Sequence, residues 1–196
     1  MLAILMPAAG ASTRMEGRDK LMERINDVPL LVRQVGRALS TGAPVFVTTR
    51  VDRPARIAAL AGLACGTLTC VPVAGPDTGL SASLRAGVDA LPANIDRVMI
   101  LLPDLPDIQT TDLTAMIDAH GEHPETVLRG CTAVGAPGHP VILPRAWFAR
   151  LRALTGDAGM GTLLSGAWLH PLPGTRARTD LDTPADWIAW RIKNGL

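Results

Sequence analysis

Four short apolar runs alternate with amphipathic segments through the first half of the chain, and this alternation restricts the fold more than any other sequence feature. The apolar runs are typical of buried strands and lie at residues 2–6, 44–48, 67–73 and 97–102. The segments between them carry apolar residues at helical spacing and span residues 29–39, 54–63 and 80–91. Apolar strands separated by helices predict a mainly parallel sheet, covered on both faces and joined by right-handed crossovers.

The second half of the chain is less regular. Its patterns predict helices over residues 110–120, 145–154 and 183–193, and a further turn near Asp157. They predict strands over residues 126–134, 141–143 and 167–171, and a loop over the sequence GAPGHP. Because no linker, repeat or low-complexity tract interrupts the 196 residues, we predict one domain spanning residues 1–196.

Composition excludes several classes of partner. The net charge is +1 and aromatic residues make up only 3% of the chain, whereas proteins that bind nucleic acid usually carry a basic excess or stacking platforms. No apolar run approaches the roughly 20 residues that a membrane-spanning helix needs. We therefore expect neither nucleic acid nor a membrane as partner.

The cysteines and histidines show no metal-binding or redox spacing. Three cysteines, an odd number, predict reduced, mostly buried thiols in a cytoplasmic protein. His120 and His123 are three residues apart, but no third metal ligand lies near them in the sequence, so we interpret both as surface residues.

A loop rich in small residues follows the first strand. Its sequence, MPAAGASTRMEGRDKL, covers residues 6–21 and ends with basic residues that include Arg14 and Lys20. Small residues let backbone N–H groups approach a phosphate chain, and cations complete the neutralisation. The loop is neither a Walker A loop nor a dinucleotide fingerprint, since Gly10 and Gly17 are seven residues apart. The pattern favours a phosphate-binding loop of another type over a plain surface turn with solvated cations.

A carboxylate follows the fourth apolar run. Asp104 lies between two prolines in ILLPDLPDI, directly after a predicted buried strand. Ligands of open α/β sheets bind at the carboxyl ends of strands, and a rigid carboxylate there suits a hard cation such as magnesium, which often accompanies phosphate. The alternative role of Asp104 is that of a turn former.

Two further segments carry candidate polar groups. In TDLDTPADW, spacing alone favours Asp182 or Thr183 as the cap of a helix beginning at Pro184, and a metal-binding role for Asp182 depends on accepting Asp104 as the first ligand. In DTGLSASLRAGVDAL, Gly79 and Ser83 flank the start of a helix, where small hydroxyl residues can contact a base or a ribose. An ordinary capped helix is the simpler account of that segment.

Taken together, these stretches resemble the molybdenum-cofactor nucleotidyltransferases, within the wider class of glycosyltransferase-A-like nucleotidyltransferases. PAAGASTRMEGRDKL is similar to that class's L-A-A-G-x-S-x-R-M-G-x-x-K-L loop, and GLSASLRAG to its nucleoside-contacting segment. LLPDLPDI is similar to its D-x-P metal motif, and DLDTPADW to its closing D-x-D-T-P. The elements G-H-P and G-D-x-G within residues 135–164 narrow the resemblance to the molybdopterin cytidylyltransferases. The sequence departs from the usual pattern at Pro7, Glu16 and Leu105.

The resemblance implies a single Rossmann-like domain of the glycosyltransferase-A type, with a mainly parallel sheet flanked by helices. It implies magnesium-dependent transfer of CMP from CTP to molybdopterin, with release of pyrophosphate. Residues 1–109 would mainly bind the nucleotide and residues 110–196 the acceptor. The implied partners are CTP or another nucleoside triphosphate, molybdopterin, and a molybdoenzyme or its chaperone.

The resemblance also implies roles for the matching residues of the nucleotide half. Backbone groups of Ala8, Ala9 and Gly10 would contact the nucleotide, and Gly79 and Ser83 would contact the nucleoside. The loop sequence AAG contrasts with AGG in guanylyl-transferring relatives. Because the Cβ of Ala9 takes space that a glycine would leave open, we expect CTP to be used in preference to GTP.

The remaining roles concern catalysis, metal and acceptor. Arg14 and Lys20 would hold the triphosphate and stabilise the charge of the departing pyrophosphate, as catalytic residues. Asp104 and Asp182 would bind one magnesium ion. The candidates for the acceptor side are His139 and Asp157.

Three other functions remain as alternatives. An enzyme of the same fold could act on a sugar or polyol phosphate. A catalytically silent nucleotide-binding protein could serve a molybdoenzyme as an accessory. A dinucleotide-dependent oxidoreductase is disfavoured because the glycine fingerprint is absent.

Overall fold

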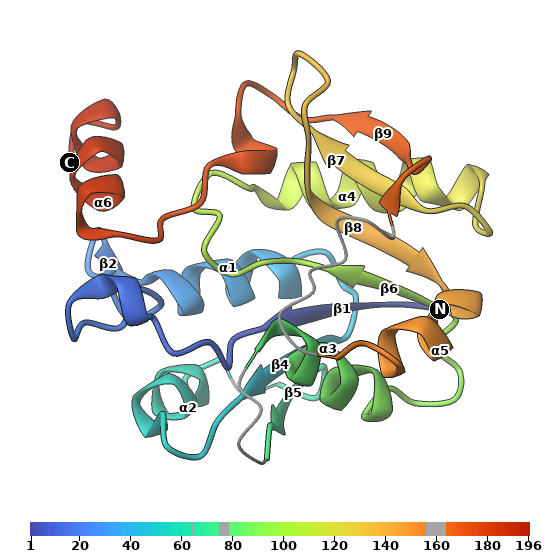
Figure 1. The fold of residues 1–196 in the computed structure, drawn as a ribbon, viewed down its shortest axis with the longest axis horizontal. Coiled ribbons are helices and arrows are strands. Elements are labelled where there is room, and N and C mark those ends of the chain that lie inside the picture. The colour runs from blue at the N-terminus through green and yellow to red at the C-terminus, as the bar shows by residue number, and fades with distance from the viewer. Residues whose placement is uncertain (64, 75–78, 156–163) are drawn as a thin grey trace.

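The computed structural model describes residues 1–63, 65–74, 79–155 and 164–196, and one mixed sheet forms the centre of this part of the chain (Figure 1). The seven strands of this sheet are β1 (Leu2–Pro7), β4 (Val45–Thr49), β5 (Leu68–Pro72), β6 (Arg97–Ile100), β7 (Leu128–Cys131), β8 (Pro137–Pro144) and β9 (Trp168–Pro171). They lie in the order β5-β4-β1-β6-β8-β7-β9.

Only β8 runs against the direction of the other strands described in the sheet. β1 pairs in parallel with β4 and β6, and β4 pairs in parallel with β5. β8 is antiparallel to both β6 and β7, which restores the original direction in β7 and in its parallel neighbour β9. The prediction of a mainly parallel sheet is confirmed.

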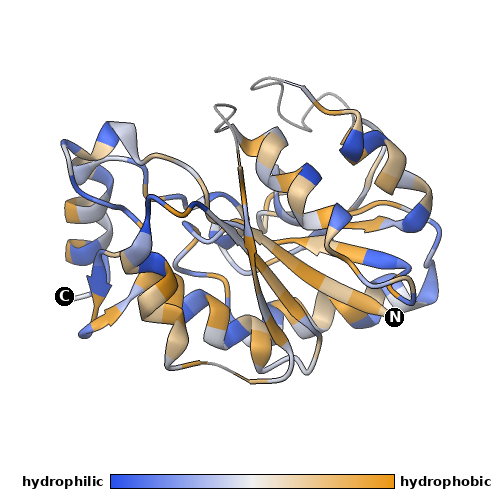
Figure 2. Ribbon diagram, turned by 90° about the horizontal axis from the view of Figure 1, so that it is seen from below, coloured by the Kyte–Doolittle hydropathy of each residue, from blue (hydrophilic) through white to orange (hydrophobic). Residues whose placement is uncertain are grey.

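Helices cover both faces of the sheet. Those described are α1 (Leu30–Leu39), α2 (Pro54–Ala61), α3 (Leu80–Asp89), α4 (Thr110–Glu122), α5 (Phe148–Arg152) and α6 (Pro184–Lys193). Because side chains alternate along a strand, Ile4 of β1 packs with α1 and α4 while Leu5 packs with α3 and α5. In Figure 2 the apolar strands lie between these two layers of helices. No helix in the described ranges has the length and apolar character needed to span a bilayer.

Several local expectations differ from the structure. The prediction of mostly buried cysteines is wrong, since Cys65 and Cys70 are exposed. The strand predicted as buried over residues 67–73 is β5, which is largely exposed because it lies at the edge of the sheet.

The segment predicted as a GAPGHP loop turns at Gly135, with φ of 83°, but enters β8 at Pro137, where β6 and β7 supply backbone partners on both sides. A hairpin of β2 (Arg24–Ile25) and β3 (Val28–Pro29) was not predicted, because each strand has only two residues. The interpretation of His120 as a surface residue is wrong: the ring is fully buried, and its Nε2 lies 2.9 Å from the carbonyl oxygen of Thr126.

The loop after β1 is anchored in a small apolar cluster that joins residues from both ends of the chain. Met15 is fully buried against Leu181 and Trp187, and the cluster also contains Ile25 of β2. Figure 1 accordingly shows α6 beside β2, although the two are separated by most of the sequence. Through Met15, the loop and the segment before α6 are packed as one unit.

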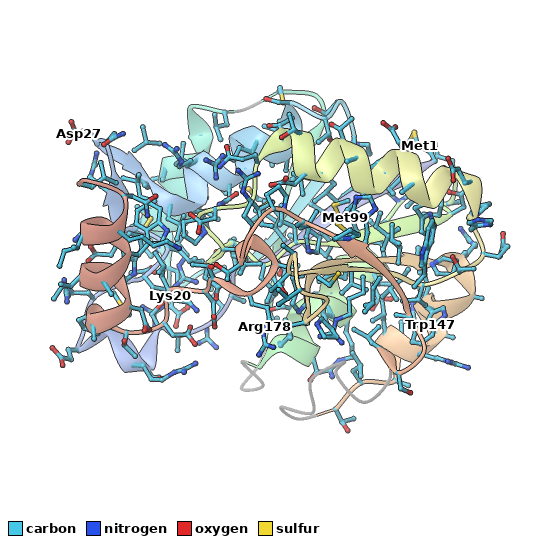
Figure 3. All side chains as sticks on the ribbon, turned by 90° about the horizontal axis from the view of Figure 1, so that it is seen from above. Met1, Lys20, Asp27, Met99, Trp147 and Arg178 are labelled. Carbon is cyan, nitrogen blue, oxygen red and sulfur yellow. The ribbon has the colours of Figure 1, made fainter. Side chains whose placement is uncertain are left out.

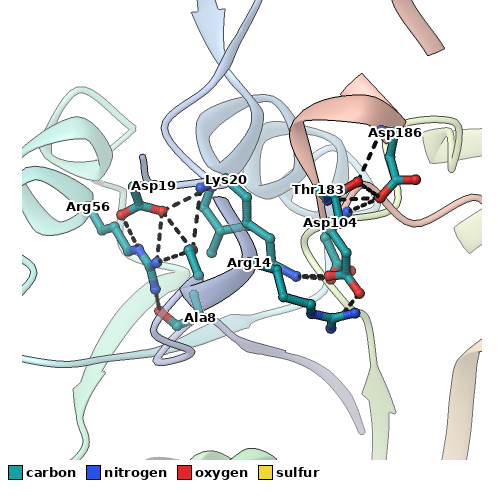
Figure 4. A network of polar contacts seen from close by, with 11 residues as sticks. Ala8, Arg14, Asp19, Lys20, Arg56, Asp104, Thr183 and Asp186 are labelled. Carbon is teal, nitrogen blue, oxygen red and sulfur yellow. Dashed lines mark hydrogen bonds and ion pairs between the residues drawn. The ribbon is translucent and has the colours of Figure 1, made fainter. Parts of the chain in front are cut away.

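A buried arginine from α2 supports the same loop from below (Figure 4). The side chain of Arg56 is fully buried and binds Asp19 with two short contacts, Nε to Oδ2 at 2.8 Å and Nη2 to Oδ1 at 2.7 Å. It also donates to the carbonyl oxygen of Ala8 at 2.6 Å and to Oγ of Ser12 at 3.2 Å. Burial acts to raise the pKa of Asp19, but the hydrogen bond and charge of Arg56 outweigh it and hold this pKa below its usual value.

A glycine allows two segments of the second half to approach each other closely. Arg176–Arg178 form a short 3-10 turn that packs on β8. A Cβ added at Gly138 would lie 2.0 Å from the carbonyl oxygen of Ala177, which is backbone and cannot move aside easily. Only a glycine therefore lets the chain leading to Leu181 lie directly on β8.

Replacing this glycine tests the close approach. We expect Gly138→Ala to lower the free energy of unfolding by about 2 kcal/mol, because the added methyl group overpacks a rigid contact. Gly121→Ala is the matched control, since nothing lies within 4 Å of the Cβ that it adds. Urea unfolding of both variants measures the difference, and equal stability of Gly138→Ala and the wild type would contradict the packing described.

A second variant tests the buried arginine. Arg56→Met should lower the free energy of unfolding by about 3 kcal/mol, because Asp19 loses the counter-charge that offsets its burial. Adding Asp19→Asn should recover part of that loss, since the uncompensated charge is then removed. The control is Arg50→Met, which breaks an exposed pair with Asp52 and should change stability little. Urea unfolding of the four proteins gives the comparison, and a loss from Arg56→Met no larger than from the control would contradict the anchoring role.

Candidate active site

A cleft of about 360 Å³ lies at the carboxyl ends of β1 and β6, where ligands of open α/β sheets are expected. We call it the first cleft. Segments from both ends of the chain and from its middle supply the lining, which consists of Pro7, Gly10, Arg14, Lys20, Leu21, Gly79, Leu80, Ser83, Leu102, Pro103, Asp104, Asp180 and Asp182.

Most of the candidate residues meet in the first cleft. The structure brings together Gly10, Arg14, Lys20, Gly79, Ser83, Asp104 and Asp182. Ala8 and Ala9 are fully buried and do not line it. His139 lines a neighbouring cleft, and Asp157 lies outside the described residues.

Lys20 lies between two carboxylates that are far apart in the sequence (Figure 4). Its Nζ is 2.6 Å from Oδ2 of Asp104 and 2.6 Å from Oδ1 of Asp182. Burial acts to lower the pKa of Lys20, but the charges and hydrogen bonds of Asp104 and Asp182 outweigh it, so this pKa is raised. Arg14, a largely exposed side chain, contacts the other oxygen of Asp182 at 2.6 Å. The two carboxylates thus surround one position, which the ammonium group of Lys20 occupies.

The same two carboxylates fit a divalent cation. The Oδ1 atom of Asp104 is buried and has no hydrogen-bond partner among the described residues, so this side chain has a further oxygen ligand to offer. In the described ranges no group of three or more His, Cys, Asp or Glu side chains could hold a metal. An ion at Asp104 and Asp182 would therefore take its other ligands from water or from a bound phosphate compound, as magnesium commonly does.

Local capping explains why Asp182 is available to the cleft. Thr183 is the N-cap of α6, where its Oγ1 accepts from the N–H of Asp186 at 3.2 Å. Asp186 completes the capping box by accepting from the N–H of Thr183 at 2.8 Å. Of the two capping candidates, the structure selects Thr183. Leu181 N–H donates to the carbonyl oxygen of Asp104 at 3.1 Å, so the two carboxylate segments are also joined through the backbone.

The loop after β1 presents a run of backbone donors. The N–H of Ala8 donates to the carbonyl oxygen of Thr48 at 2.9 Å, and the carbonyl oxygen of Ala8 accepts from Arg56. Both backbone groups of Ala8 are therefore engaged within the protein. Beyond it, the N–H groups of residues 9–14 donate no hydrogen bond to any described residue. Ser12 has φ of 55°, and this left-handed turn is typical of backbone nests that bind anions.

A second cleft of about 260 Å³ adjoins the first one and shares Leu102 and Asp180 with it. His139 lines this second cleft, and burial together with the charge of Arg129 lowers the pKa of His139 to about 4. The ring is therefore neutral near pH 7. Its Nδ1 is buried without a partner among the described residues.

Three arginines around the clefts were not predicted from the sequence. Arg56 could have been found, because it shares the buried face of α2 with Leu60 and a charge on such a face needs a partner. Arg129 and Arg178 line the second cleft, but they come from separate segments and follow no motif. Nothing in the sequence places them together.

Comparisons with known proteins identify the family and the fold. The family model described as the MobA-like NTP transferase domain matches residues 4–172. No curated protein matches the sequence. Among solved structures, Rv0371c from Mycobacterium tuberculosis H37Rv has a TM-score of 0.83 and 24% identity, with 96% of each chain covered. A structure of Rv0371c in complex with manganese has a TM-score of 0.75 and 22% identity, with 96% of each chain covered.

Two other solved structures have the same fold. A nucleotidyl transferase from Methanothermobacter thermautotrophicus has a TM-score of 0.76 and 24% identity, covering 98% of this chain and 97% of the other. CMP:2-keto-3-deoxy-manno-octonic acid synthetase, in complex with CTP, has a TM-score of 0.74 and 16% identity, covering 99% and 98%. Because the family match spans most of the chain, this protein belongs to the MobA-like NTP transferase domain family and is a nucleotidyltransferase.

Proposed function

We propose that this nucleotidyltransferase transfers CMP from CTP to molybdopterin with release of pyrophosphate, and that the reaction depends on magnesium. The observation that carries the proposal is the arrangement of Lys20 between Asp104 and Asp182, beside a loop with unused backbone donors. A nucleoside triphosphate with a divalent cation complements both features, since its phosphates suit the donors and its metal suits the carboxylates.

The first cleft provides for each part of the nucleotide. Backbone N–H groups of residues 10–14 and the side chain of Arg14 would bind the phosphates. Gly79 and Ser83, at the start of α3, would contact the nucleoside. Lys20 would leave the carboxylates and pair with the triphosphate, whose negative charge offers it a new partner.

Asp104 and Asp182 would hold the magnesium ion. When bound there, magnesium would supply positive charge that offsets the charge developing on the leaving pyrophosphate. The Rv0371c structure in complex with manganese supports a divalent metal in this fold. Support for CTP comes from the synthetase of the same fold that was solved with CTP.

The transfer itself needs positioning and charge neutralisation more than covalent chemistry by the protein. An oxygen of the acceptor's terminal phosphate forms a bond to the α-phosphorus of CTP. The bond from that phosphorus to the bridging β-phosphate oxygen breaks, and pyrophosphate leaves with the electron pair. Arg14 and Lys20 stabilise the charge that accumulates on the leaving group.

Molybdopterin is proposed as the acceptor because of the G-H-P and G-D-x-G elements within residues 135–164. His139 and Asp157 would contact it, and His139 lines the second cleft. We further propose that the protein works in the cytoplasm and passes its product to a molybdoenzyme or its chaperone.

The function is tested by the choice of nucleotide. Ala9 is fully buried in a cluster with Val73 and Ala82, so its Cβ fills space between the loop and the start of α3, where the nucleoside would bind. We expect pyrophosphate release with molybdopterin and magnesium to be faster with CTP than with GTP, and Ala9→Gly to narrow that preference. The preference is measured by competition between equal concentrations of CTP and GTP. Equal use of CTP and GTP by the wild type would contradict the cytidylyl assignment. Pyrophosphate release only with a sugar or polyol phosphate would contradict molybdopterin as the acceptor.

The position of Lys20 generates a second test, which uses binding as well as rate. Lys20→Met removes the cation that competes for Asp104 and Asp182, so Mn²⁺ should bind about tenfold more tightly in the absence of nucleotide, a change of about 1.4 kcal/mol. Turnover should nevertheless fall by roughly 10²–10³, because one donor to the leaving group is lost. Arg18→Met is the control, since Arg18 pairs with Glu23 and does not line the first cleft. Titration calorimetry with Mn²⁺ measures the affinity, and an unchanged affinity in Lys20→Met would contradict the exchange of lysine and metal.

A further inference from the structure

We propose that the second cleft binds the phosphate group of the acceptor through Arg129 and Arg178. This inference rests on the proposed nucleotidyl transfer and adds residues that no sequence motif indicates. The second cleft is lined by Leu102, Leu105, Arg129, Pro137, Gly138, His139, Ala177, Arg178 and Asp180.

Two arginines that form no ion pair among the described residues line the second cleft. Burial and the nearby charge of Arg178 lower the pKa of Arg129, so the two guanidinium groups are close enough to repel each other. Asp180 also lines the cleft, but it pairs with neither arginine. Two guanidinium groups against one carboxylate leave an excess positive charge, which favours an anionic ligand.

Nearby arginines differ from this pair in their partners. Arg176, two residues before Arg178, binds both oxygens of the buried Asp112 at 3.0 Å. Arg14, in the first cleft, pairs with Asp182. Arg129 and Arg178 form no ion pair with a described carboxylate, so their charges remain available to a ligand.

Gly138 brings the two arginines to one place. Its carbonyl oxygen accepts from Nε of Arg129 at 2.9 Å, which fixes that side chain and leaves its Nη groups to donate elsewhere. A Cβ added at Gly138 would lie 2.9 Å from Cγ of Arg178, so the stem of Arg178 packs directly on this glycine. Figure 3 shows Arg178 on the turn that crosses over β8. Both arginine side chains therefore contact the same backbone unit, Gly138.

A phosphate monoester matches these donors. Such a group carries about −1.5 to −2 charges near pH 7, and guanidinium groups bind its oxygens in pairs. Apart from the carboxylate of Asp180, the rest of the lining is uncharged: His139 is neutral, its Nδ1 has no partner among the described residues, and Leu102, Leu105 and Ala177 are apolar. A heterocycle with hydrogen-bonding groups suits this lining.

The position of the second cleft suits transfer to the bound phosphate. It shares Leu102 and Asp180 with the first cleft, so a phosphate held at Arg129 and Arg178 lies next to the space proposed for the nucleotide. The carboxylate of Asp104 is near enough to act on the pKa of His139 across that boundary. The arginine pair would thus position one phosphate oxygen for attack on the α-phosphorus.

The experiment measures phosphate binding without turnover. The probe is phenyl phosphate, titrated by NMR into protein whose first cleft is saturated with α,β-methylene-CTP and magnesium. We expect Arg178→Gln and Arg129→Gln each to weaken phenyl phosphate binding at least tenfold. Arg152→Gln, which removes an exposed arginine paired with Asp89 outside both clefts, should leave it unchanged. Phenol, which lacks the phosphate, should not distinguish the four proteins.

Binding of phenyl phosphate that is equal in the wild type, Arg129→Gln and Arg178→Gln would overturn the proposal. Arg178 is exposed, so Arg178→Gln should fold. It keeps the proposal testable even if Arg129→Gln, which loses the hydrogen bond to Gly138, disturbs β7. With molybdopterin as acceptor, Arg178→Gln should raise KM for molybdopterin at least tenfold and leave KM for CTP unchanged. Failure of wild-type protein to bind α,β-methylene-CTP would instead contradict the proposed function, while the comparison of Arg178→Gln with Arg152→Gln would still report on the second cleft.

Discussion

The buried guanidinium of Arg56 is the interaction on which the first cleft depends. Taking a charge fully out of water is costly, and here Asp19, Ala8 and Ser12 together offset that cost. All three partners lie in the loop after β1, so satisfying Arg56 determines the path of that loop. The backbone donors of residues 9–14 and the position of Lys20 follow from this path. A polar network below the loop, together with Met15 in its apolar cluster, thus makes a segment of small residues rigid enough to line a binding site.

The two clefts differ in how their charges are balanced. In the first cleft Arg14 and Lys20 pair with Asp104 and Asp182, so the site is internally neutralised before any ligand arrives. Under the proposed function, the metal becomes the new partner of Asp104 and Asp182, and the triphosphate becomes the new partner of Arg14 and Lys20. Metal and triphosphate would therefore bind together. In the second cleft Arg129 and Arg178 have no carboxylate partner among the described residues. An acceptor phosphate would bind there without a metal, which keeps the two anionic substrates in distinct electrostatic environments.

Local sequence patterns predicted the fold of the first half well. The apolar runs at β1, β4, β5 and β6 and the helical periodicity between them determine a parallel arrangement, because each pattern is satisfied by its own segment. The second half was predicted less completely. Pro137 and its neighbours resemble a loop, yet they continue β8 because β6 and β7 offer hydrogen-bond partners on both sides. His120 is buried for a similar reason, since its ring nitrogen Nε2 has a hydrogen-bond partner in the carbonyl oxygen of Thr126.

The sequence by itself determined the class of sheet, the loop of small residues and the two carboxylate segments, because these features are encoded within short stretches of chain. It left open whether Asp182 or Thr183 caps α6, and the tertiary structure decided this by bringing Asp182 to Lys20. Only the tertiary structure assembled the Arg56–Asp19 support and the Arg129–Arg178 pair. The physical reason is that an ion pair or an unbalanced charge depends on what surrounds a side chain in space, and residues far apart in the chain supply those surroundings.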